Sequence, residues 1–199
     1  ERPGLHITHG WGMTEMSPIG AFTPQRANDP SLTLDQRVKA KAIQGQRMFG
    51  VDLKIVDEEG KRLPQDGTAS GELFVRGNAV VNGYFNNEEA TARALDKDGW
   101  FGTGDVARIS PNGFLTIVDR TKDMVKSGGE WISSIDVENT VMSCPGVANA
   151  AVIGVPHPKW TERPLLIVEC HDGVALTEDA VQAYLEPHIV KWWKPDKVI

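Results

Sequence analysis

The sequence has few cysteines, no long apolar run and no excess of basic residues, and each absence excludes a class of protein. Its two cysteines, Cys144 and Cys170, have neither metal-site spacing nor a C-x-x-C pattern. No apolar run approaches the roughly 20 residues that cross a bilayer, and no signal peptide opens the chain. The net charge of −6 argues against nucleic acid or an anionic membrane as the main partner. We therefore expect a cytoplasmic protein with two reduced, buried thiols.

What the chain does contain is an ordinary globular composition. Its 199 residues are 40% hydrophobic and 24% charged, which is usual for a soluble protein. This length fits one large domain or two smaller ones. The sequence has no internal repeat and no low-complexity tract. The functional signal must therefore come from short motifs and from their order.

The first motif is the segment HGWGMTE, residues 9–15, which two glycines punctuate and a carboxylate ends. Gly10 and Gly12 would let the backbone approach a ligand closely. Thr14 and Glu15 supply the hydroxyl and carboxylate that a phosphate oxygen and a magnesium ion need. A plain surface turn is the alternative interpretation, because short turns with glycine and polar residues are common.

The second motif lies in the stretch DGWFGTGDVARISPNGFLTIVDRTKDMVKSGGEWISS. Asp105 follows a Gly-Thr-Gly turn, and Arg120 comes later, before a basic, glycine-rich hairpin at 122–130. A carboxylate can accept two hydrogen bonds from a sugar diol, and an arginine fork can bind hydroxyls or phosphate. The alternatives are an Asp105 that caps its own turn and an Arg120 in a solvated salt bridge. With the first motif, this stretch predicts a nucleotide site.

The two motifs, with GELFVRG (71–77) and NGYFNNEEAT (82–91) between them, resemble the AMP-forming adenylating superfamily. That superfamily includes acyl-CoA synthetases, luciferases and the adenylation domains of peptide synthetases. The first motif is similar to its aromatic-Gly-x-Thr-Glu motif. The second is similar to its Thr-Gly-Asp motif followed by its Asp-Arg-x-Lys-Asp hinge motif. The resemblance runs over essentially the whole chain, with the motifs in the family's order.

The resemblance implies a role for each residue of the two motifs. The Trp11 indole would lie against the adenine face. Thr14 would contact the α-phosphate and Glu15 would hold Mg²⁺, so both would serve catalysis. Asp105 would take the ribose hydroxyls, and Arg120 would be a second ribose or phosphate contact. The implied ATP- and AMP-binding residues are Gly10, Trp11, Gly12, Met13, Thr14, Asp105 and Arg120.

The resemblance also implies two domains and a hinge between them. We expect the β-rich end of a large AMP-binding domain over 1–121 and a small, mobile, incomplete α+β domain over 122–199, which is an α/β to α+β fold. Lys122 matches the hinge position, where many relatives carry an acidic residue. Since a hinge needs a backbone that absorbs a large φ/ψ change, the assignment of Lys122 is purely positional.

The loop KSGGEW, residues 126–131, matches the loop that lines the pantetheine tunnel in relatives. The implied coenzyme A contacts are Gly128, Gly129, Glu130 and Trp131. A tight hairpin whose glycines serve geometry alone is the alternative, and the two interpretations do not exclude each other. Trp131 could be tunnel wall or core.

Periodicity and turn residues predict the local structure around these motifs. A half-buried strand is expected at 51–57 and another at 72–76. Hairpins are expected around 111–113 and 127–130. Helices are expected after the capping residues Asn87 and Ser134, and a further helix over 177–185. The weak apolar pattern of residues 23–46 predicts loop with a helical turn at most.

Three further positions in the C-terminal part call for an interpretation. His157, flanked by prolines and a lysine, is interpreted as a solvated surface residue and not as a general base. Thr161 stands where the family usually has glycine, so the local turn departs from the family pattern. Trp192 and Trp193 are interpreted as a strand edge that packs onto the small domain, and not as an aromatic binding site.

The chemistry that the resemblance implies has two steps. A carboxylate attacks the α-phosphate of ATP to give an acyl-adenylate, and the thiol of coenzyme A then displaces AMP. The segments RTKDMVKSGGEWISS and VPHPKWTERP most resemble the corresponding segments of medium- to long-chain fatty acyl-CoA synthetases. ATP, Mg²⁺, coenzyme A and a carboxylic acid are thus the expected ligands, and the resemblance also allows a homodimer.

Two motifs of the family are not found in this sequence. The family's phosphate loop normally precedes the first residue of this sequence, and its late catalytic lysine normally follows the last. We therefore expect the 199 residues alone to be inactive.

Two alternative functions remain open. One is a non-catalytic nucleotide-binding module, and the other is an adenylation domain that loads a carrier protein.

Overall fold

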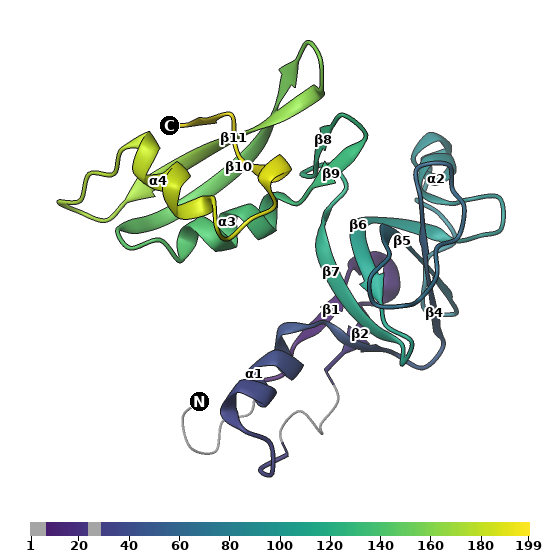
Figure 1. The fold of residues 1–199 in the computed structure, drawn as a ribbon. Coiled ribbons are helices and arrows are strands. Elements are labelled where there is room, and N and C mark those ends of the chain that lie inside the picture. Colours follow the sequence, from purple (N-terminus) through teal and green to yellow (C-terminus); the bar gives the residue numbers. More distant parts are fainter. Residues whose placement is uncertain (1–6, 24–28) are drawn as a thin grey trace. The chain divides into compact units, whose positions relative to one another are not determined.

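The computed structural model describes residues 7–23 and 29–199, and the chain divides into two units, Glu1–Ile117 and Val118–Ile199 (Figure 1). We call these the first unit and the second unit. The division falls inside strand β7 (Phe114–Arg120), close to the expected domain boundary after residue 121. The first unit is mainly β and the second mixes helices with a sheet, so the expected α/β to α+β class is confirmed. Among the described residues, no helix has the length and apolar character that crossing a bilayer requires.

The first unit is built on a seven-stranded sheet in the order β1-β2-β3-β7-β6-β5-β4. The pairings β1–β2, β2–β3, β3–β7, β4–β5 and β5–β6 are all antiparallel. Besides β7, the strands are β1 (Gly10–Gly12), β2 (Ile19–Phe22), β3 (Gly45–Arg47), β4 (Val51–Val56), β5 (Ser70–Gly77) and β6 (Phe101–Ile109). This order places the N-terminal motif and the Asp105 strand in one sheet.

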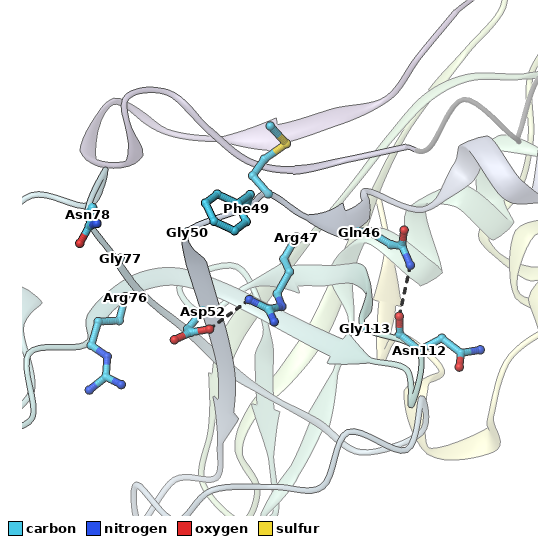
Figure 2. A pocket seen from close by; sticks show the side chains of 11 residues that line it. Gln46, Arg47, Phe49, Gly50, Asp52, Arg76, Gly77, Asn78, Asn112 and Gly113 are labelled. Carbon is cyan, nitrogen blue, oxygen red and sulfur yellow. Dashed lines mark hydrogen bonds and ion pairs between the residues drawn. The ribbon is translucent and has the colours of Figure 1, made fainter.

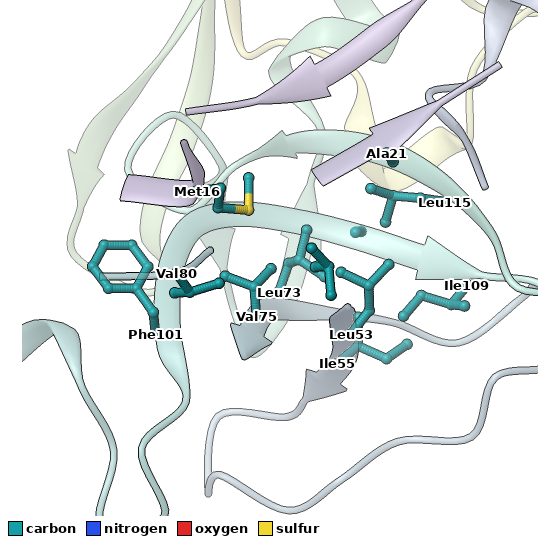
Figure 3. Close-up of a cluster of buried hydrophobic side chains, with 12 residues drawn as sticks. Met16, Ala21, Leu53, Ile55, Leu73, Val75, Val80, Phe101, Ile109 and Leu115 are labelled. Atoms are coloured by element: carbon teal, nitrogen blue, oxygen red, sulfur yellow. The ribbon is translucent and has the colours of Figure 1, made fainter. Parts of the chain in front are cut away.

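The core of the first unit follows from alternation along its strands (Figure 3). In β4, Val51, Leu53 and Ile55 are buried, while Asp52 is exposed. Such a period of two puts one side of a strand against the core, which confirms the predicted half-buried strand. The short 3-10 helix η1 (Thr14–Met16) adds the fully buried Met16. The N-terminal motif is therefore anchored in the core by its own next residue.

Helix α1 (Leu34–Ala42) corrects the expectation of loop over 23–46, of which residues 24–28 lie outside the described residues. None of its residues is buried, so no apolar stripe marks it in the sequence. The available signal was a capping box, in which Thr33 Oγ1 accepts from the Gln36 N–H and Gln36 Oε1 accepts from the Thr33 N–H. Helix α2 (Glu88–Ala94), by contrast, starts as predicted, because Asn87 Oδ1 accepts from the Ala90 N–H at 3.0 Å.

An ion pair between Lys54 and Asp96 links β4 to the loop after α2. Their side chains are 13% and 25% exposed. The Asp96 carboxylate also accepts from the backbone N–H groups of Asp98 and Trp100. Burial alone would raise the pKa of Asp96, but its bonds to Lys54, Trp100 and Asp98 outweigh burial and lower this pKa below 3.8.

Replacing Asp96 by asparagine is expected to lower the unfolding free energy of the first unit by about 2 kcal/mol at pH 7, because Lys54 loses its partner. The folded pKa is lowered, so the carboxylate's stabilisation is complete above the ordinary value of 3.8 and disappears as the pH falls below it. Urea unfolding from pH 7 down to pH 3 measures both effects, with Asp98→Asn as control. A difference between Asp96→Asn and the wild type that stayed constant over this range would contradict the prediction.

The second unit has a sheet in the order β10-β11-β8-β9, and β12 pairs in parallel with β11. Its strands are β8 (Val125–Ser127), β9 (Glu130–Ile132), β10 (Val147–His157), β11 (Thr161–Cys170) and β12 (Lys197–Val198). Its helices are α3 (Ser134–Met142), α4 (Glu178–Leu185) and the 3-10 helix η3 (Lys191–Trp193). The helices bury Val137, Val141, Val181 and Leu185 in a core shared with Leu166 of β11.

Three details of the second unit differ from the sequence-based predictions. The N-cap of α3 is Ser133, whose Oγ accepts from the Asp136 N–H at 3.1 Å, so the cap lies one residue before the predicted Ser134. Trp192 lies in η3 and not on a strand edge, although it packs against the core as expected. Both thiols are free, but only Cys144 is buried, while Cys170 is partly exposed.

Candidate functional site

In the first unit, the predicted site residues Trp11 and Asp105 meet. The indole Nε1–H of Trp11 in β1 donates to Oδ2 of Asp105 in β6 at 2.9 Å. Asp105 lies within a strand, is only 9% exposed, and its backbone N–H donates to Thr103 Oγ1 at 3.1 Å. Its position in β6 disfavours the alternative of an aspartate that merely caps its own turn.

Glu15 meets a residue that the sequence analysis did not single out, Tyr84. The Tyr84 hydroxyl donates to Glu15 Oε1 at 2.9 Å, and the Val81 N–H donates to the Glu15 carbonyl oxygen at 2.9 Å. Partial burial, followed by the nearby Glu15 carboxylate, raises the pKa of Tyr84 above 10.0, so its hydroxyl remains a donor at neutral pH. The tyrosine belongs to NGYFNNEEAT, and its place in that motif was the signal that could have found it.

The rest of the N-terminal motif divides into exposed and packed positions. Gly10, Gly12 and Thr14 are exposed, whereas Met13 is half-buried and packs on the core. A Cβ at Gly12 would collide with the carbonyl oxygen of Pro18, while a Cβ at Gly10 would make only ordinary contacts. Glycine at 12 is therefore required by the close approach of the chain to itself.

The acidic groups of the described residues do not form a metal cage. No cluster of three or more His, Cys, Asp or Glu side chains suited to a metal ion occurs in the described ranges. Mg²⁺ is commonly held by one or two carboxylates together with substrate phosphates and water. Glu15 fits a site of that kind, in which the protein supplies a minority of the ligands.

A cavity of about 890 Å³ in the first unit lies at other residues (Figure 2). Arg47, Asp52 and Arg76 are among its lining residues, and none of the predicted site residues is. Arg47 Nη1 is already engaged, because it pairs with Asp52 at 3.0 Å and donates to the Val51 carbonyl oxygen at 2.8 Å. The cavity and the Trp11–Asp105 contact are thus separate features of the first unit.

The hinge motif lies at the start of the second unit, and its most buried residue is Asp119. This carboxylate is fully buried, and Oδ2 accepts from both the N–H and the hydroxyl of Ser134, at 2.7 and 3.0 Å. Arg120 and Lys122 are exposed beside it, in a turn closed by bonds from the N–H groups of Asp123 and Met124 to the Arg120 carbonyl. Asp119 was not predicted as a structural residue, although its place as the first residue of the Asp-Arg-x-Lys-Asp motif was an available signal.

The predicted coenzyme A loop is the β8–β9 hairpin, and it rests on two tryptophans. Gly128 and Gly129 both have positive φ, 60° and 85°. The Gly128 N–H donates to the Trp160 carbonyl oxygen at 2.8 Å, and Trp160 meets Trp192 edge-to-face with ring centroids 4.8 Å apart. Trp131 is half-buried, with Lys126 Nζ 4.8 Å from the centre of its ring, and is thus outside the buried core.

Gly128 and Gly129 offer a matched test of this packing. A Cβ at Gly128 would lie 2.8 Å from Trp160 Cε3, whereas one at Gly129 would meet nothing within 4 Å. Both positions carry the strain of a positive φ, so we expect Gly128→Ala to destabilise the second unit by about 2 kcal/mol more than Gly129→Ala. Urea unfolding followed by tryptophan fluorescence measures the difference. Equal losses of unfolding free energy in the two variants would contradict the prediction, because they would show that the Trp160 side chain moves aside at no energetic cost.

The neighbouring β10–β11 turn accounts for the role of His157 and for the backbone conformation of Thr161. His157 Nδ1 accepts from the backbone N–H groups of Lys159 and Trp160, at 3.1 and 3.2 Å, so this nitrogen serves the turn. Thr161 has a φ of 69°, a conformation that favours glycine over a β-branched residue. The departure from the family pattern at Thr161 therefore falls where the backbone is left-handed.

Comparison with known proteins gives two family models and many relatives. A model described as AMP-binding enzyme matches residues 1–85, and one described as AMP-binding enzyme C-terminal domain matches residues 136–199. A 3-methylmercaptopropionyl-CoA ligase of Ruegeria lacuscaerulensis is 47% identical over 100% of this chain and 36% of its own length. A medium-chain-fatty-acid–CoA ligase of Ectopseudomonas oleovorans is 43% identical over 98% of this chain and 35% of its own. The chain thus spans about a third of the length of these relatives.

Solved structures agree with the sequence relatives. ATP-bound MatB from Rhodopseudomonas palustris superposes with a TM-score of 0.83 and 31% identity, over 98% of this chain and 37% of that one. The o-succinylbenzoate CoA synthetase MenE of Bacillus subtilis, in complex with the acyl-adenylate intermediate OSB-AMP, gives a TM-score of 0.80 and 28% identity. That match covers 98% of this chain and 37% of the synthetase.

Proposed function

Because the chain belongs to the AMP-binding enzyme family, we propose that the protein containing it is an AMP-forming acid–thiol ligase. It would activate a carboxylic acid with ATP and pass the acyl group to coenzyme A. The names of the relatives support this proposal, since they include CoA ligases for several acids. Within the family we propose residues 1–121 as part of the AMP-binding domain and 122–199 as the small C-terminal domain.

The observation that carries the proposal is the pairing of motifs that lie far apart in the sequence. Trp11 bonds to Asp105, and Glu15 bonds to Tyr84, so three of the motifs meet in the first unit. A carboxylate has about four lone-pair positions. The bond from Trp11 therefore does not by itself use all the acceptor positions of Asp105.

The proposed chemistry assigns a part to each residue of the N-terminal motif. In the first step an oxygen of the acid attacks the α-phosphorus of ATP, and the bond to pyrophosphate breaks. Negative charge then gathers on the phosphate oxygens, and fixed donors near them lower the barrier. The exposed Thr14 hydroxyl would donate to an α-phosphate oxygen, and Glu15 would hold Mg²⁺, which offsets that charge when bound. Gly10, Gly12 and Met13 would complete the nucleotide contacts.

The second unit would serve nucleotide positioning and the thiol-transfer step. Arg120 would contact ribose or phosphate, and Lys122 would act as the hinge. The hairpin residues Gly128, Gly129, Glu130 and Trp131 would contact the pantetheine arm of coenzyme A. Support comes from the exposed hairpin and from the turn that holds Lys122. A cytoplasmic location and a homodimer stay predictions.

For the acid we propose a medium- to long-chain fatty acid. The relatives of Ectopseudomonas oleovorans and Thermus thermophilus, 43% and 42% identical, are named for such acids. A short sulfur-containing acid is the second candidate, because the two 3-methylmercaptopropionyl-CoA ligases are 47% and 45% identical.

The test is an AMP-release assay on the natural gene product that contains these residues. The acids should run from acetate to palmitate and include 3-methylmercaptopropionate, each with and without coenzyme A and Mg²⁺. AMP formation that requires both an acid and coenzyme A supports the proposal. Nucleotide binding without pyrophosphate release would favour the binding module instead. Acyl transfer to a carrier protein, but not to coenzyme A, would favour a carrier-loading adenylation domain.

A further inference from the structure

We propose that Trp11 is a positioning residue for Asp105 and thereby sets how strongly the site selects nucleotides with ribose hydroxyls. This inference rests on the proposed function, in which Asp105 takes those hydroxyls. An aromatic ring at this position could offer a face to adenine whether it were phenylalanine, tyrosine or tryptophan. The indole N–H of tryptophan adds a hydrogen-bond donor, and this N–H donates to Asp105 Oδ2 at 2.9 Å.

The indole is itself held in place, so it can act as a rigid donor. A Cβ at Gly20 would lie 2.7 Å from Trp11 Cζ3 and 2.9 Å from Met16 Sδ, which shows how closely β2 covers the ring. Met16 is fully buried, and Trp11 packs on the same core. Turning the indole away from Asp105 would therefore disturb the core.

The backbone of Asp105 is fixed by a second, independent chain of bonds. Its N–H donates to Thr103 Oγ1 at 3.1 Å, and the Thr103 hydroxyl donates to the Leu73 carbonyl oxygen at 3.0 Å. These bonds place the Cα, and they do not involve the carboxylate itself. The Trp11 donor bonds directly to Oδ2 of the carboxylate, and so it contributes to the orientation in which both oxygens can meet a diol.

The test is the variant Trp11→Phe, which keeps an aromatic face and removes the N–H. Affinities of the natural gene product for ATP and for 2′,3′-dideoxy-ATP are measured by calorimetry. We expect the Kd for ATP to rise about 10-fold or more, as for the loss of a bond to a charged group. The Kd for the dideoxy nucleotide should rise less than about 3-fold, since it has no hydroxyls for Asp105 to hold.

Trp100→Phe is the matched control, because it makes the same chemical change in the same unit. The Trp100 ring faces Lys54 and Arg76, with Lys54 Nζ 4.8 Å and Arg76 Cζ 4.5 Å from its centre. This variant should leave the ratio of the two affinities unchanged. Equal losses for both nucleotides in Trp11→Phe, or no loss for either, would overturn the inference.

Asp105→Asn separates failure of this inference from failure of the proposed function. If Asp105→Asn leaves the ratio of affinities unchanged, the ribose role of Asp105 falls, and the inference falls with it. If it removes the preference for ATP while Trp11→Phe does not, only the inference fails. Should Trp11→Phe not fold, the Trp11 indole N–H resonance of the wild type gives a second measurement. It should move more in Asp105→Asn than any other indole resonance, and an unmoved resonance would overturn the inference.

Discussion

Asparagine in place of Asp105 is expected to lower kcat/KM for ATP in the natural gene product by about 100-fold or more, since the two ribose hydroxyl bonds proposed for this charged acceptor would weaken together. Asparagine has the same size, and its oxygen can still accept from the Trp11 N–H. The expected loss therefore reports the carboxylate's charge and second oxygen, and not a collapse of the strand. Pyrophosphate release against ATP concentration measures it.

The control for Asp105→Asn is Asp98→Asn, an exposed carboxylate in the same unit. It should keep kcat/KM for ATP within about 2-fold of the wild type, as surface changes away from a site usually do. Similar values for the two variants would remove Asp105 from the proposed nucleotide site. The pairing with Trp11 would then be a packing contact of the first unit alone.

Alanine in place of Asp119 is expected to lower the unfolding free energy of the second unit by about 3–5 kcal/mol, because buried and partly buried donors lose a charged acceptor. Those donors are the Ser134 N–H, the Ser134 hydroxyl and the Ile135 N–H at 3.4 Å on Oδ2, and the Arg120 N–H at 2.7 Å on Oδ1. The carboxylate also lies at the N-terminus of α3, where negative charge is favoured. Urea unfolding followed by tryptophan fluorescence measures the loss.

Asp123→Ala is the control for the Asp119 variant, because Asp123 is an exposed aspartate of the same hinge motif. It should change the unfolding free energy by no more than about 0.5 kcal/mol. A comparable loss in both variants would mean that general charge effects, and not the bonds from Asp119 to the start of α3, explain the result. Asp119→Asn should fall between the two, since its amide offers one accepting oxygen and turns a donor toward other donors.

Local signals predicted the elements whose residues show their own burial or capping. The alternation of Val51, Leu53 and Ile55 and the cap at Asn87 are both present in the structure. Helix α1 was missed because it buries nothing, and a helix without an apolar face leaves no periodic trace. Its capping box at Thr33 and Gln36 was present in the sequence, but it is a signal of only two residues and lies close to turn-forming residues.

The contacts between the candidate site residues could not be predicted from the sequence. Trp11 and Asp105 are 94 residues apart in the sequence, and their contact depends on how β1 and β6 are placed in the same sheet. Tyr84 and Glu15 are 69 residues apart, and Asp119 reaches 15 residues ahead to Ser134. Such pairings follow from sheet register and from long-range packing, which residue types alone do not determine.

Both cysteines belong to the second unit, and this distribution makes thiol chemistry a selective probe of that unit. Burial, followed by the proximity of Cys170, raises the pKa of the Cys144 thiol above 9.0, and the thiolate is the form that alkylating reagents attack. Modification of Cys144 must therefore wait for the second unit to open. Since the sequence has no cysteine before residue 144, the labelling rate is silent about the first unit. Labelling of Cys144 would thus report whether the second unit opens when Asp119 or Asp96 is changed.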